Sequence, residues 1–335
     1  MQSGTPGLLT GLLKQVSRSF YLTMRILPGG VRSQISLGYL LARISDTVAD
    51  TELVPASDRL GALAAFGARI EGSRAAAVDF SGFLASQKDS SEVVLLRRAD
   101  EAVAVLQQFP EADQNLIRDV IRVIISGQEL DLRRFDGAGE RNIIALDSEE
   151  ELDDYTYRVA GVVGEFWTKL CRARLFPDAR LDGDALLAKG IRFGKGLQLV
   201  NILRDIPKDL RQGRCYIPRR LLAEHGLQPA DLLAPANDAR FRPVYDPLLR
   251  RAAGFLCDAW DYTNLIPRGQ VRVRLGCAWP VLIGWETLEA LKSENVLDPS
   301  RRIKVSRKRL RSLIFRSIVA YPWPRYWNRL GPRPI

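Results

Sequence analysis

Residues 198–209 read Gln198-Leu-Val-Asn201-Ile-Leu-Arg204-Asp205-Ile-Pro207-Lys-Asp209. At 100° per residue, one stripe of a helix carries four polar side chains at i, i+3, i+7 and i+11: Gln198, Asn201, Asp205 and Asp209. The other faces are almost entirely Leu, Ile and Val, a composition typical of a central helix. An unpaired buried carboxylate is costly, so the stripe either faces water or is neutralised by a bound group. The stretch is therefore a candidate metal site.

A second stretch near the N-terminus repeats this pattern. Residues 39–50 read Tyr39-Leu-Leu-Ala-Arg43-Ile-Ser-Asp46-Thr-Val-Ala-Asp50, which places Tyr39, Arg43, Asp46 and Asp50 on one helical stripe. A single D-x-x-x-D pair is common on solvated helices. Two matched pairs on two apolar helices are much less expected by chance, so we predict that both pairs are functional.

The donor types indicate which cation would bind. Mg²⁺ takes oxygen ligands, usually one or two carboxylates together with substrate phosphate oxygens. Arg43 and Arg204 stand beside the pairs, where each would neutralise phosphate oxygens or orient the carboxylates. Di-iron and zinc sites are disfavoured, because His225 is the single histidine and the four cysteines lack C-x-x-C spacing. Pro207 removes the hydrogen bond to the Leu203 carbonyl and is predicted to kink or end its helix.

Four ordered motifs resemble those of the squalene/phytoene synthase family, over roughly residues 14 to 290. They are Ser17-Arg18-Ser19-Phe20, Tyr39-x-x-x-Arg43-x-x-Asp46-Thr-x-x-Asp50, Tyr155-x-Tyr-x-Val159-Ala-Gly161-x-Val163-Gly164 and Gln198-x-x-Asn201-Ile-Leu-Arg204-Asp205-x-x-x-Asp209. The resemblance implies an all-α fold, a single large helical domain of the isoprenoid synthase type with a central cavity between two Asp-bearing helices. It also implies head-to-head joining of two prenyl diphosphates through a cyclopropylcarbinyl diphosphate.

The resemblance assigns roles to individual residues. Tyr155 is the expected catalytic tyrosine, and Asp46, Asp50, Asp205 and Asp209 are the expected catalytic metal ligands. The expected substrate-binding residues are Ser17, Arg18, Ser19, Phe20, Tyr39, Arg43, Val159, Val163, Gln198, Asn201, Arg204 and Arg214. Structural alternatives stay open: Ser17 as a helix cap, Arg214 as a surface side chain, and Gly161 and Gly164 as room for a neighbouring helix instead of a prenyl tail.

The product is predicted from fewer residues. Gly276-Cys-Ala-Trp-Pro280 with Thr287-Leu288 is more similar to squalene synthases than to phytoene synthases. The first expectation is condensation of two farnesyl diphosphates via presqualene diphosphate to squalene, with Mg²⁺ and NADPH. By resemblance, Asn201, Lys304 and Arg307 are the candidate NADPH contacts. The alternatives are phytoene or dehydrosqualene synthesis without NADPH, and presqualene diphosphate or hydroxysqualene synthesis.

Charge is concentrated at the C-terminal end. We expect a catalytic domain over residues 1–300 and a tail over 301–335, either part of that domain or appended to it. The tail holds 11 Lys/Arg and no Asp/Glu, which leaves the rest of the 335-residue chain at a formal net charge of −1. A uniformly basic nucleic-acid surface is therefore not indicated. Basic and aromatic residues together suit an anionic membrane surface, and a helix that merely covers the domain is the alternative.

Location is predicted from the hydropathy pattern. The first residues lack the basic and apolar regions of a signal peptide, and no apolar run of about 18 residues occurs. We expect a cytoplasmic enzyme without a transmembrane segment, and peripheral contact at the inner face of the membrane is the accompanying option.

Overall fold

The computed structural model describes residues 11–16, 20–87, 89–301 and 303–333. The fold is 73% helical, which confirms the expected all-α class, and its only strand pairing in these ranges is between two short strands. The chain forms two compact units: unit 1 is Met1–Asp136 with Phe166–Asp178, and unit 2 is Gly137–Glu165 with Ala179–Ile335. Each unit has its own core and carries one of the two aspartate pairs.

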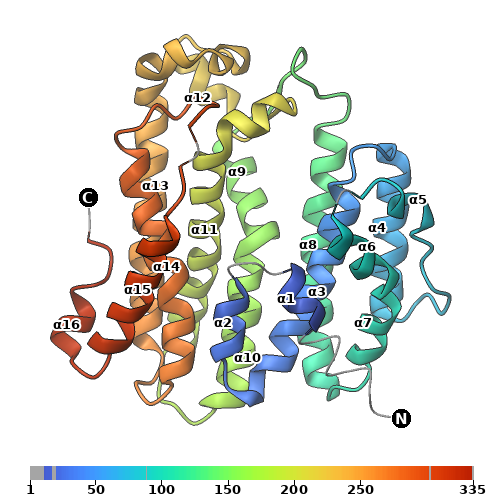
Figure 1. Ribbon diagram of the computed structural model, residues 1–335, viewed down its shortest axis with the longest axis vertical. Helices are drawn as coiled ribbons and strands as arrows, with labels where there is room; N and C mark the ends of the chain where they lie inside the picture. Colours follow the sequence, from blue (N-terminus) through green and yellow to red (C-terminus); the bar gives the residue numbers. More distant parts are fainter. Residues whose placement is uncertain (1–10, 17–19, 88, 302, 334–335) are drawn as a thin grey trace. The chain divides into compact units, whose positions relative to one another are not determined.

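Unit 1 is built around one long apolar helix, α3 (Figure 1). Its helices are α1 (Leu13–Val16), α2 (Phe20–Ile26), α3 (Gly29–Ala49), α4 (Ala56–Glu71), α5 (Ser81–Leu84), α6 (Ser90–Arg97), α7 (Ala99–Leu106) and α8 (Glu111–Arg134). Leu37, Leu40, Leu41 and Ile44 of α3 are completely buried, and α3 packs against α4, α7 and α8. Three of the long helices begin directly after a proline, at Pro28, Pro55 and Pro110.

A buried ion pair ties three helices of unit 1 together. Asp113 of α8 accepts hydrogen bonds from Gln34 of α3 (2.9 Å) and from Arg174 of α10 (Val162–Leu175; 3.0 Å from Nε). Asp113 is almost fully buried, so the guanidinium and the amide replace the water that the carboxylate loses on folding. This contact fixes the N-terminal part of α3 against α8, whereas the end that carries Asp46 is held to α8 by Gln128.

Unit 2 is organised on α11 and α13, which run side by side (Figure 1). Its elements are β1 (Ile144–Ala145), α9 (Glu149–Thr156), the π-helix η2 (Tyr157–Gly161), the first four residues of α10 (Val162–Leu175), α11 (Gly183–Arg211), β2 (Arg214–Cys215), α12 (Arg219–Glu224), the 3₁₀ turns η3 (Pro229–Leu233) and η4 (Pro235–Asn237), α13 (Asp238–Leu265), α14 (Val271–Leu291), α15 (Arg307–Ala320) and α16 (Pro324–Asn328). β1 and β2 pair in parallel, with Ile144 opposite Arg214.

The C-terminal helices fold back onto unit 2. The Trp279 indole of α14 donates to the Ser317 hydroxyl of α15 at 3.0 Å. Trp327 of α16 stacks on Trp260 of α13, with ring centroids 5.0 Å apart, and its indole N–H donates to the side-chain Oδ1 of Asn264 at 2.7 Å. Residues 307–328 therefore pack on the helical body through one face. None of the helices in the described ranges has the length and apolar character needed to cross a bilayer.

Candidate active site

The first aspartate pair lies at the C-terminal end of α3. Asp46 is half-buried, and the Gln128 side-chain amide of α8 donates to its Oδ1 at 2.6 Å. Asp50 is the exposed C-cap residue, and its backbone N–H donates to the Asp46 carbonyl oxygen at 2.8 Å. The i, i+4 spacing predicted from sequence is therefore retained at a helix end, where Asp50 is open to solvent.

Electrostatics at this pair favour the gain of a positive charge. Burial, together with the neighbouring charge of Asp50, raises the pKa of Asp46 to about 6, although Arg43 and the Gln128 hydrogen bond act in the opposite direction. The ionised Asp46 is therefore costly in the protein alone. A divalent cation removes that cost by neutralising both carboxylates, and carboxylate oxygens are the donors that Mg²⁺ prefers.

Gln128 is a site residue that sequence reasoning missed. Helical periodicity alone does not reveal which polar group of α8 faces Asp46. Gln128 is buried, and its Oε1 has no hydrogen-bond partner among the described residues, although its Nε2 holds the carboxylate. A glutamine on an otherwise apolar helical face was the available signal.

The upstream residues of the α3 stripe contact other helices of unit 1. Arg43 forms an ion pair with Glu92 of α6, and its Nε is buried without a hydrogen-bond partner among the described residues. The Tyr39 hydroxyl donates to the Val16 carbonyl oxygen at 3.3 Å. Arg43 thus forms its ion pair with Glu92, and it acts on Asp46 through its positive charge, which lowers the pKa of that carboxyl.

The second aspartate pair lies on α11 and carries its own counter-charge. Arg204 donates to both oxygens of Asp205, at 2.8 Å from Nε and 2.6 Å from a terminal nitrogen. These hydrogen bonds, with the charges of Asp205 and Asp209, raise the pKa of the Arg204 guanidinium. The fork orients Asp205 and leaves the carboxylate partly exposed. Of the predicted upstream residues on α11, Gln198 is half-buried and Asn201 is exposed.

Pro207 neither ends α11 nor leaves its backbone unsatisfied. The helix continues to Arg211, four residues beyond the proline. A proline at this position cannot donate to the Leu203 carbonyl. The Tyr245 hydroxyl of α13 donates to that carbonyl instead, at 3.2 Å. Tyr245 is completely buried, and burial raises its pKa, so the hydroxyl stays protonated and able to donate. The second Asp pair therefore lies on a continuous helix.

Tyr155 lies in an aromatic stack at the start of a π-helical turn. Its ring stacks on Tyr216 with centroids 4.7 Å apart and planes at 22°, and both tyrosines are buried. The next residues, Tyr157–Gly161, form the π-helix η2, which includes the half-buried Val159, and Val163 beyond it is exposed. Single π-turns inside helices are often found at functional sites, because the extra residue changes the direction of neighbouring side chains.

Glycines at this turn make room for another helix. A Cβ on Gly164 would lie 1.8 Å from the Gly190 carbonyl oxygen of α11, and one on Gly194 would lie 2.1 Å from the Ala160 carbonyl oxygen. Gly161 is less crowded: a Cβ there would lie 3.0 Å from the Tyr157 ring and 3.2 Å from the Lys195 side chain. Of the two alternatives left open by the sequence, close helix packing accounts for Gly164.

Arg214 is placed by a short parallel strand pair. It belongs to β2 and follows Gly213, whose φ of +77° and approach to Gly139 (2.1 Å from a Cβ position) exclude other residues. Ser17, Arg18 and Ser19 lie outside the described residues, and Phe20 opens α2. Lys304 and Arg307 are exposed ahead of and at the start of α15.

The donor groups fit magnesium bound with a phosphate ligand. Among the described residues, no three His, Cys, Asp or Glu side chains gather into a cluster that could hold a metal ion by itself. Each pair offers two carboxylates, the number that Mg²⁺ usually takes when substrate phosphates complete its shell. The arrangement in each unit suits a cation that arrives with a diphosphate.

The family model described as Squalene/phytoene synthase matches residues 13–309. The chain belongs to the squalene/phytoene synthase family. This confirms the family predicted from the four motifs, and the match extends beyond the motif-bearing region into α15.

Two relatives and one solved structure illustrate the range of the family. The chain is 30% identical over 312 residues to a bifunctional lycopene cyclase/phytoene synthase of Pyrenophora tritici-repentis, covering 90% of this chain and 50% of that protein. It is 26% identical over 298 residues to the squalene synthase of Schizosaccharomyces pombe, covering 88% and 61%. The chain thus spans about half to three fifths of these relatives. A TcSQS complex with the ligand E5700 has a similar fold, with a TM-score of 0.75, 20% identity, and coverage of 93% and 86%.

Proposed function

We propose that the protein condenses two farnesyl diphosphates head to head, via presqualene diphosphate, to squalene. The family membership supports a head-to-head prenyltransferase acting on prenyl diphosphates in isoprenoid biosynthesis. The observation that carries the proposal is the half-buried Asp46, whose raised pKa and exposed neighbour Asp50 favour a bound cation. The squalene preference rests on the motif at residues 276–288.

Each aspartate pair has a proposed role in the first step. Asp46 and Asp50, with Asp205 and Asp209, would hold Mg²⁺ against the substrate diphosphates. When bound, Mg²⁺ neutralises the charge that develops on the leaving diphosphate. Arg204 keeps Asp205 in a fixed orientation through its two hydrogen bonds.

The other proposed substrate contacts shield or guide the reacting chain. Tyr155 would assist proton removal or stabilise an allylic cation with its π face, and its stack on Tyr216 holds that ring in one orientation. Val159 and Val163 would shield the cation from water. Arg214 would approach a diphosphate oxygen.

NADPH would supply the hydride that completes squalene. Lys304 and Arg307 are exposed, and neither has a carboxylate partner among the described residues, so both are available to a phosphate group. Asn201 is exposed on α11 and is the third proposed contact. Phytoene synthesis without NADPH is the second candidate, favoured by the similarity to a phytoene synthase.

Product analysis tests these alternatives directly. The pure protein is incubated with Mg²⁺ and farnesyl or geranylgeranyl diphosphate, with and without NADPH, and the lipid products are identified. Squalene that appears only with NADPH supports the proposal. Phytoene, dehydrosqualene or hydroxysqualene, or accumulation of presqualene diphosphate in the presence of NADPH, would assign the enzyme to the corresponding product class instead.

Substitutions test the metal assignment separately. Asp50→Asn and Asp205→Asn should abolish diphosphate release at saturating Mg²⁺ while circular dichroism stays unchanged. Asp178→Asn, at an exposed aspartate away from both pairs in the sequence, is the matched control and should keep full turnover. Near-normal turnover by either site variant would refute the assignment.

We also propose a cytoplasmic location with peripheral membrane contact, and we retain residues 1–300 as the catalytic domain with 301–335 as its basic tail. A C30 hydrocarbon product is insoluble in water, so delivery to a bilayer would suit this enzyme. The packing of Ser317 and Trp327 on unit 2 supports treating the tail as part of the same domain.

A further inference from the structure

The outward face of α15 and α16 exposes a continuous set of large apolar side chains. Five residues within positions 315–326 are exposed, and we call them the apolar shelf: Phe315 (67%), Ile318 (48%), Val319 (47%), Trp323 (55%) and Tyr326 (59%). Residues 315, 318 and 319 share one helical stripe. Solitary exposed apolar residues are ordinary, but a contiguous group of aromatic and aliphatic side chains marks an interaction surface.

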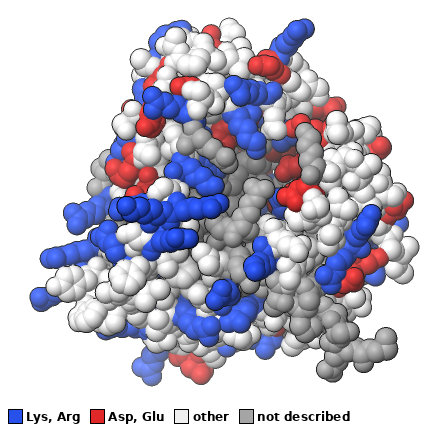
Figure 2. Space-filling view, in the orientation of Figure 1, with Lys and Arg blue, Asp and Glu red and all other residues white. Residues whose placement is uncertain are grey.

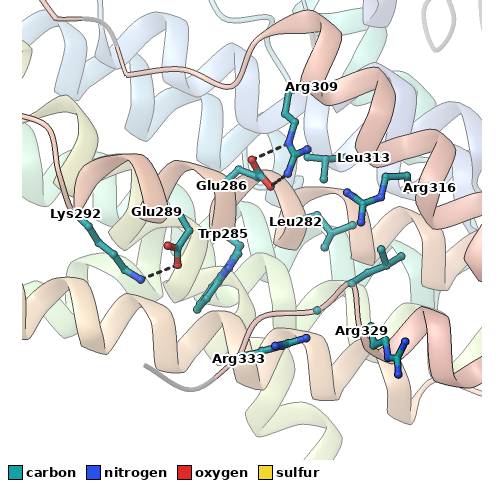
Figure 3. A pocket seen from close by; sticks show the side chains of 12 residues that line it. Leu282, Trp285, Glu286, Glu289, Lys292, Arg309, Leu313, Arg316, Arg329 and Arg333 are labelled. Carbon is teal, nitrogen blue, oxygen red and sulfur yellow. Dashed lines mark hydrogen bonds and ion pairs between the residues drawn. The ribbon is translucent and has the colours of Figure 1, made fainter.

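A basic pocket, drawn in Figure 3, shares Arg316, Arg329 and Leu330 with the groove that shelf residues line. Its volume is about 480 Å³. Arg309 and Lys292 at the pocket are paired with Glu286 and Glu289. The remaining three cations form no ion pair with a described carboxylate: Arg316, Arg329 and Arg333. Arg316 and Arg329 also line the groove along the shelf, so the unpaired positive charge adjoins the apolar surface.

The shelf is held rigidly from below. Leu313, Ser317 and Ala320 of α15 are buried, and so is Trp327 of α16. The Tyr321 hydroxyl donates to the Arg268 carbonyl oxygen at 2.6 Å, which ties the turn between the two helices to the loop before α14. Because the inner face is fixed by these contacts, the outer side chains are exposed in a preset arrangement and need no ordering when a partner binds.

We infer that α15 and α16 form a docking surface for an anionic phospholipid bilayer. In this arrangement Arg316, Arg329 and Arg333 bind headgroup phosphates, while the shelf enters the boundary between headgroups and acyl chains. Tryptophan and tyrosine favour that boundary, and basic residues favour the anionic leaflet. Figure 2 shows uncharged surface flanked by Lys and Arg on the side where Figure 1 places these helices.

Charge argues against the two other occupants. A symmetric dimer through this face would place Arg316 and Arg329 close to their own copies, since such an interface is self-complementary. A nucleic acid would need a broad basic surface, whereas residues 1–300 have a formal net charge of −1 and the shelf is apolar. A bilayer presents phosphate groups above an apolar layer, which matches the unpaired arginines and the apolar shelf beside them. The inference rests on the peripheral membrane contact proposed above and assigns it to one surface, and it does not depend on which prenyl product the enzyme releases.

Vesicle co-sedimentation of the full chain tests the inference. We expect binding to vesicles of phosphatidylcholine mixed with phosphatidylglycerol, little binding to phosphatidylcholine alone, and weakening by added salt. Arg316→Gln with Arg329→Gln should weaken binding by roughly fivefold per arginine. Phe315→Ser with Trp323→Ser should abolish binding, because the apolar contribution is lost.

Matched controls test whether binding depends on this surface or only on the overall charge and exposed apolar area of the protein. Arg250→Gln, at an exposed arginine of α13, and Leu53→Ser, at an exposed leucine of unit 1, should bind vesicles like the unchanged protein. Inorganic phosphate at the same ionic strength should not displace the protein from the vesicles. Unchanged binding by the shelf variants, absence of binding to anionic vesicles, or a dimer in solution that those variants dissociate would overturn the inference.

Discussion

Replacement of Tyr245 by phenylalanine should destabilise unit 2 through a single lost hydrogen bond. The Tyr245 hydroxyl donates a hydrogen bond to the Leu203 carbonyl oxygen, to which Pro207 cannot donate because it lacks a backbone N–H. Phenylalanine retains the ring and its contacts, with the Phe241 ring 5.5 Å away and the Arg242 guanidinium 5.2 Å away. A buried carbonyl that loses its partner costs about 1–3 kcal/mol, and we expect Tyr245→Phe to lower the free energy of unfolding by that amount.

Pro207→Ala provides the decisive comparison. Alanine restores a backbone N–H that can donate to the Leu203 carbonyl in the ordinary helical manner. In that background the carbonyl has a partner whether or not the Tyr245 hydroxyl is present. Tyr245→Phe should therefore cost much less, and the double-mutant cycle should show a coupling energy of about 1–2 kcal/mol.

Urea unfolding followed by tryptophan fluorescence is a suitable assay, because five of the six tryptophans lie in unit 2. Tyr262→Phe is the control: Tyr262 is another buried tyrosine of α13, packed against Phe193 of α11. Phe193 lies about 20 Å along α11 from Pro207, so the free-energy change caused by Tyr262→Phe should add to that caused by Pro207→Ala. If Tyr245→Phe is also additive with Pro207→Ala to within about 0.5 kcal/mol, the compensation is refuted.

Asp46→Asn and a pair of glycine variants test the site and the helix packing beside it. The pKa of Asp46 is raised from 3.8 to about 6 in the folded protein, so its contribution to stability is complete below about pH 4 and is lost as pH rises through 6. Without Mg²⁺, Asp46→Asn should therefore be more stable than the unchanged protein at pH 8, by up to roughly 3 kcal/mol in the free energy of unfolding. Urea unfolding measures this difference, which should vanish near pH 4. Gly164→Ala places a Cβ 1.8 Å from the Gly190 carbonyl oxygen and should lower the free energy of unfolding by at least about 3 kcal/mol. Gly254→Ala is the control: it has open space around it in α13 and should raise the free energy of unfolding by about 0.5–1 kcal/mol. Equal thermal midpoints for the two glycine variants would contradict the close packing at Gly164.

The all-α fold and the two aspartate stripes were predictable because both depend on local periodicity. Residues at i and i+4 share a helical face in any tertiary context, so Asp46 and Asp50, like Asp205 and Asp209, could be paired from spacing alone. Apolar residues around each stripe similarly predicted a long helix in the interior. The family assignment used the same information, since its motifs are short and ordered along the chain.

The partners of the stripes were not predictable, because they come from distant segments. Gln128 reaches Asp46 from 82 positions along the chain, and Tyr245 reaches Leu203 from 42. Nothing in the sequence around Pro207 indicates that a hydroxyl replaces its missing donor. The effect expected of the proline alone was a kink or an end, but a tertiary hydrogen bond lets the helix continue.

The role of the tail (residues 301–335) was also not predictable from sequence alone. Its composition fits both a covering helix and a membrane-binding segment, and sequence alone treats these as alternatives. The structure separates them by face: Leu313 and Ser317 are buried against unit 2, whereas Phe315 and Ile318 between and beside them are exposed. One helix therefore covers the domain with one side and exposes apolar residues on the other.

The two aspartate pairs differ in how their charge is balanced before any cation binds. The guanidinium of the adjacent Arg204 forms an ion pair with Asp205, so the negative charge of Asp205 is balanced before any cation binds. Asp46 has only a neutral amide from Gln128 and a more distant arginine that Glu92 engages, and burial raises its pKa to about 6. Below that pH a cation at the first pair must displace a proton, whereas at the second it competes with Arg204. Acidification should therefore weaken magnesium binding at the α3 pair through Asp46 itself, which makes that pair the pH-sensitive half of the proposed chemistry.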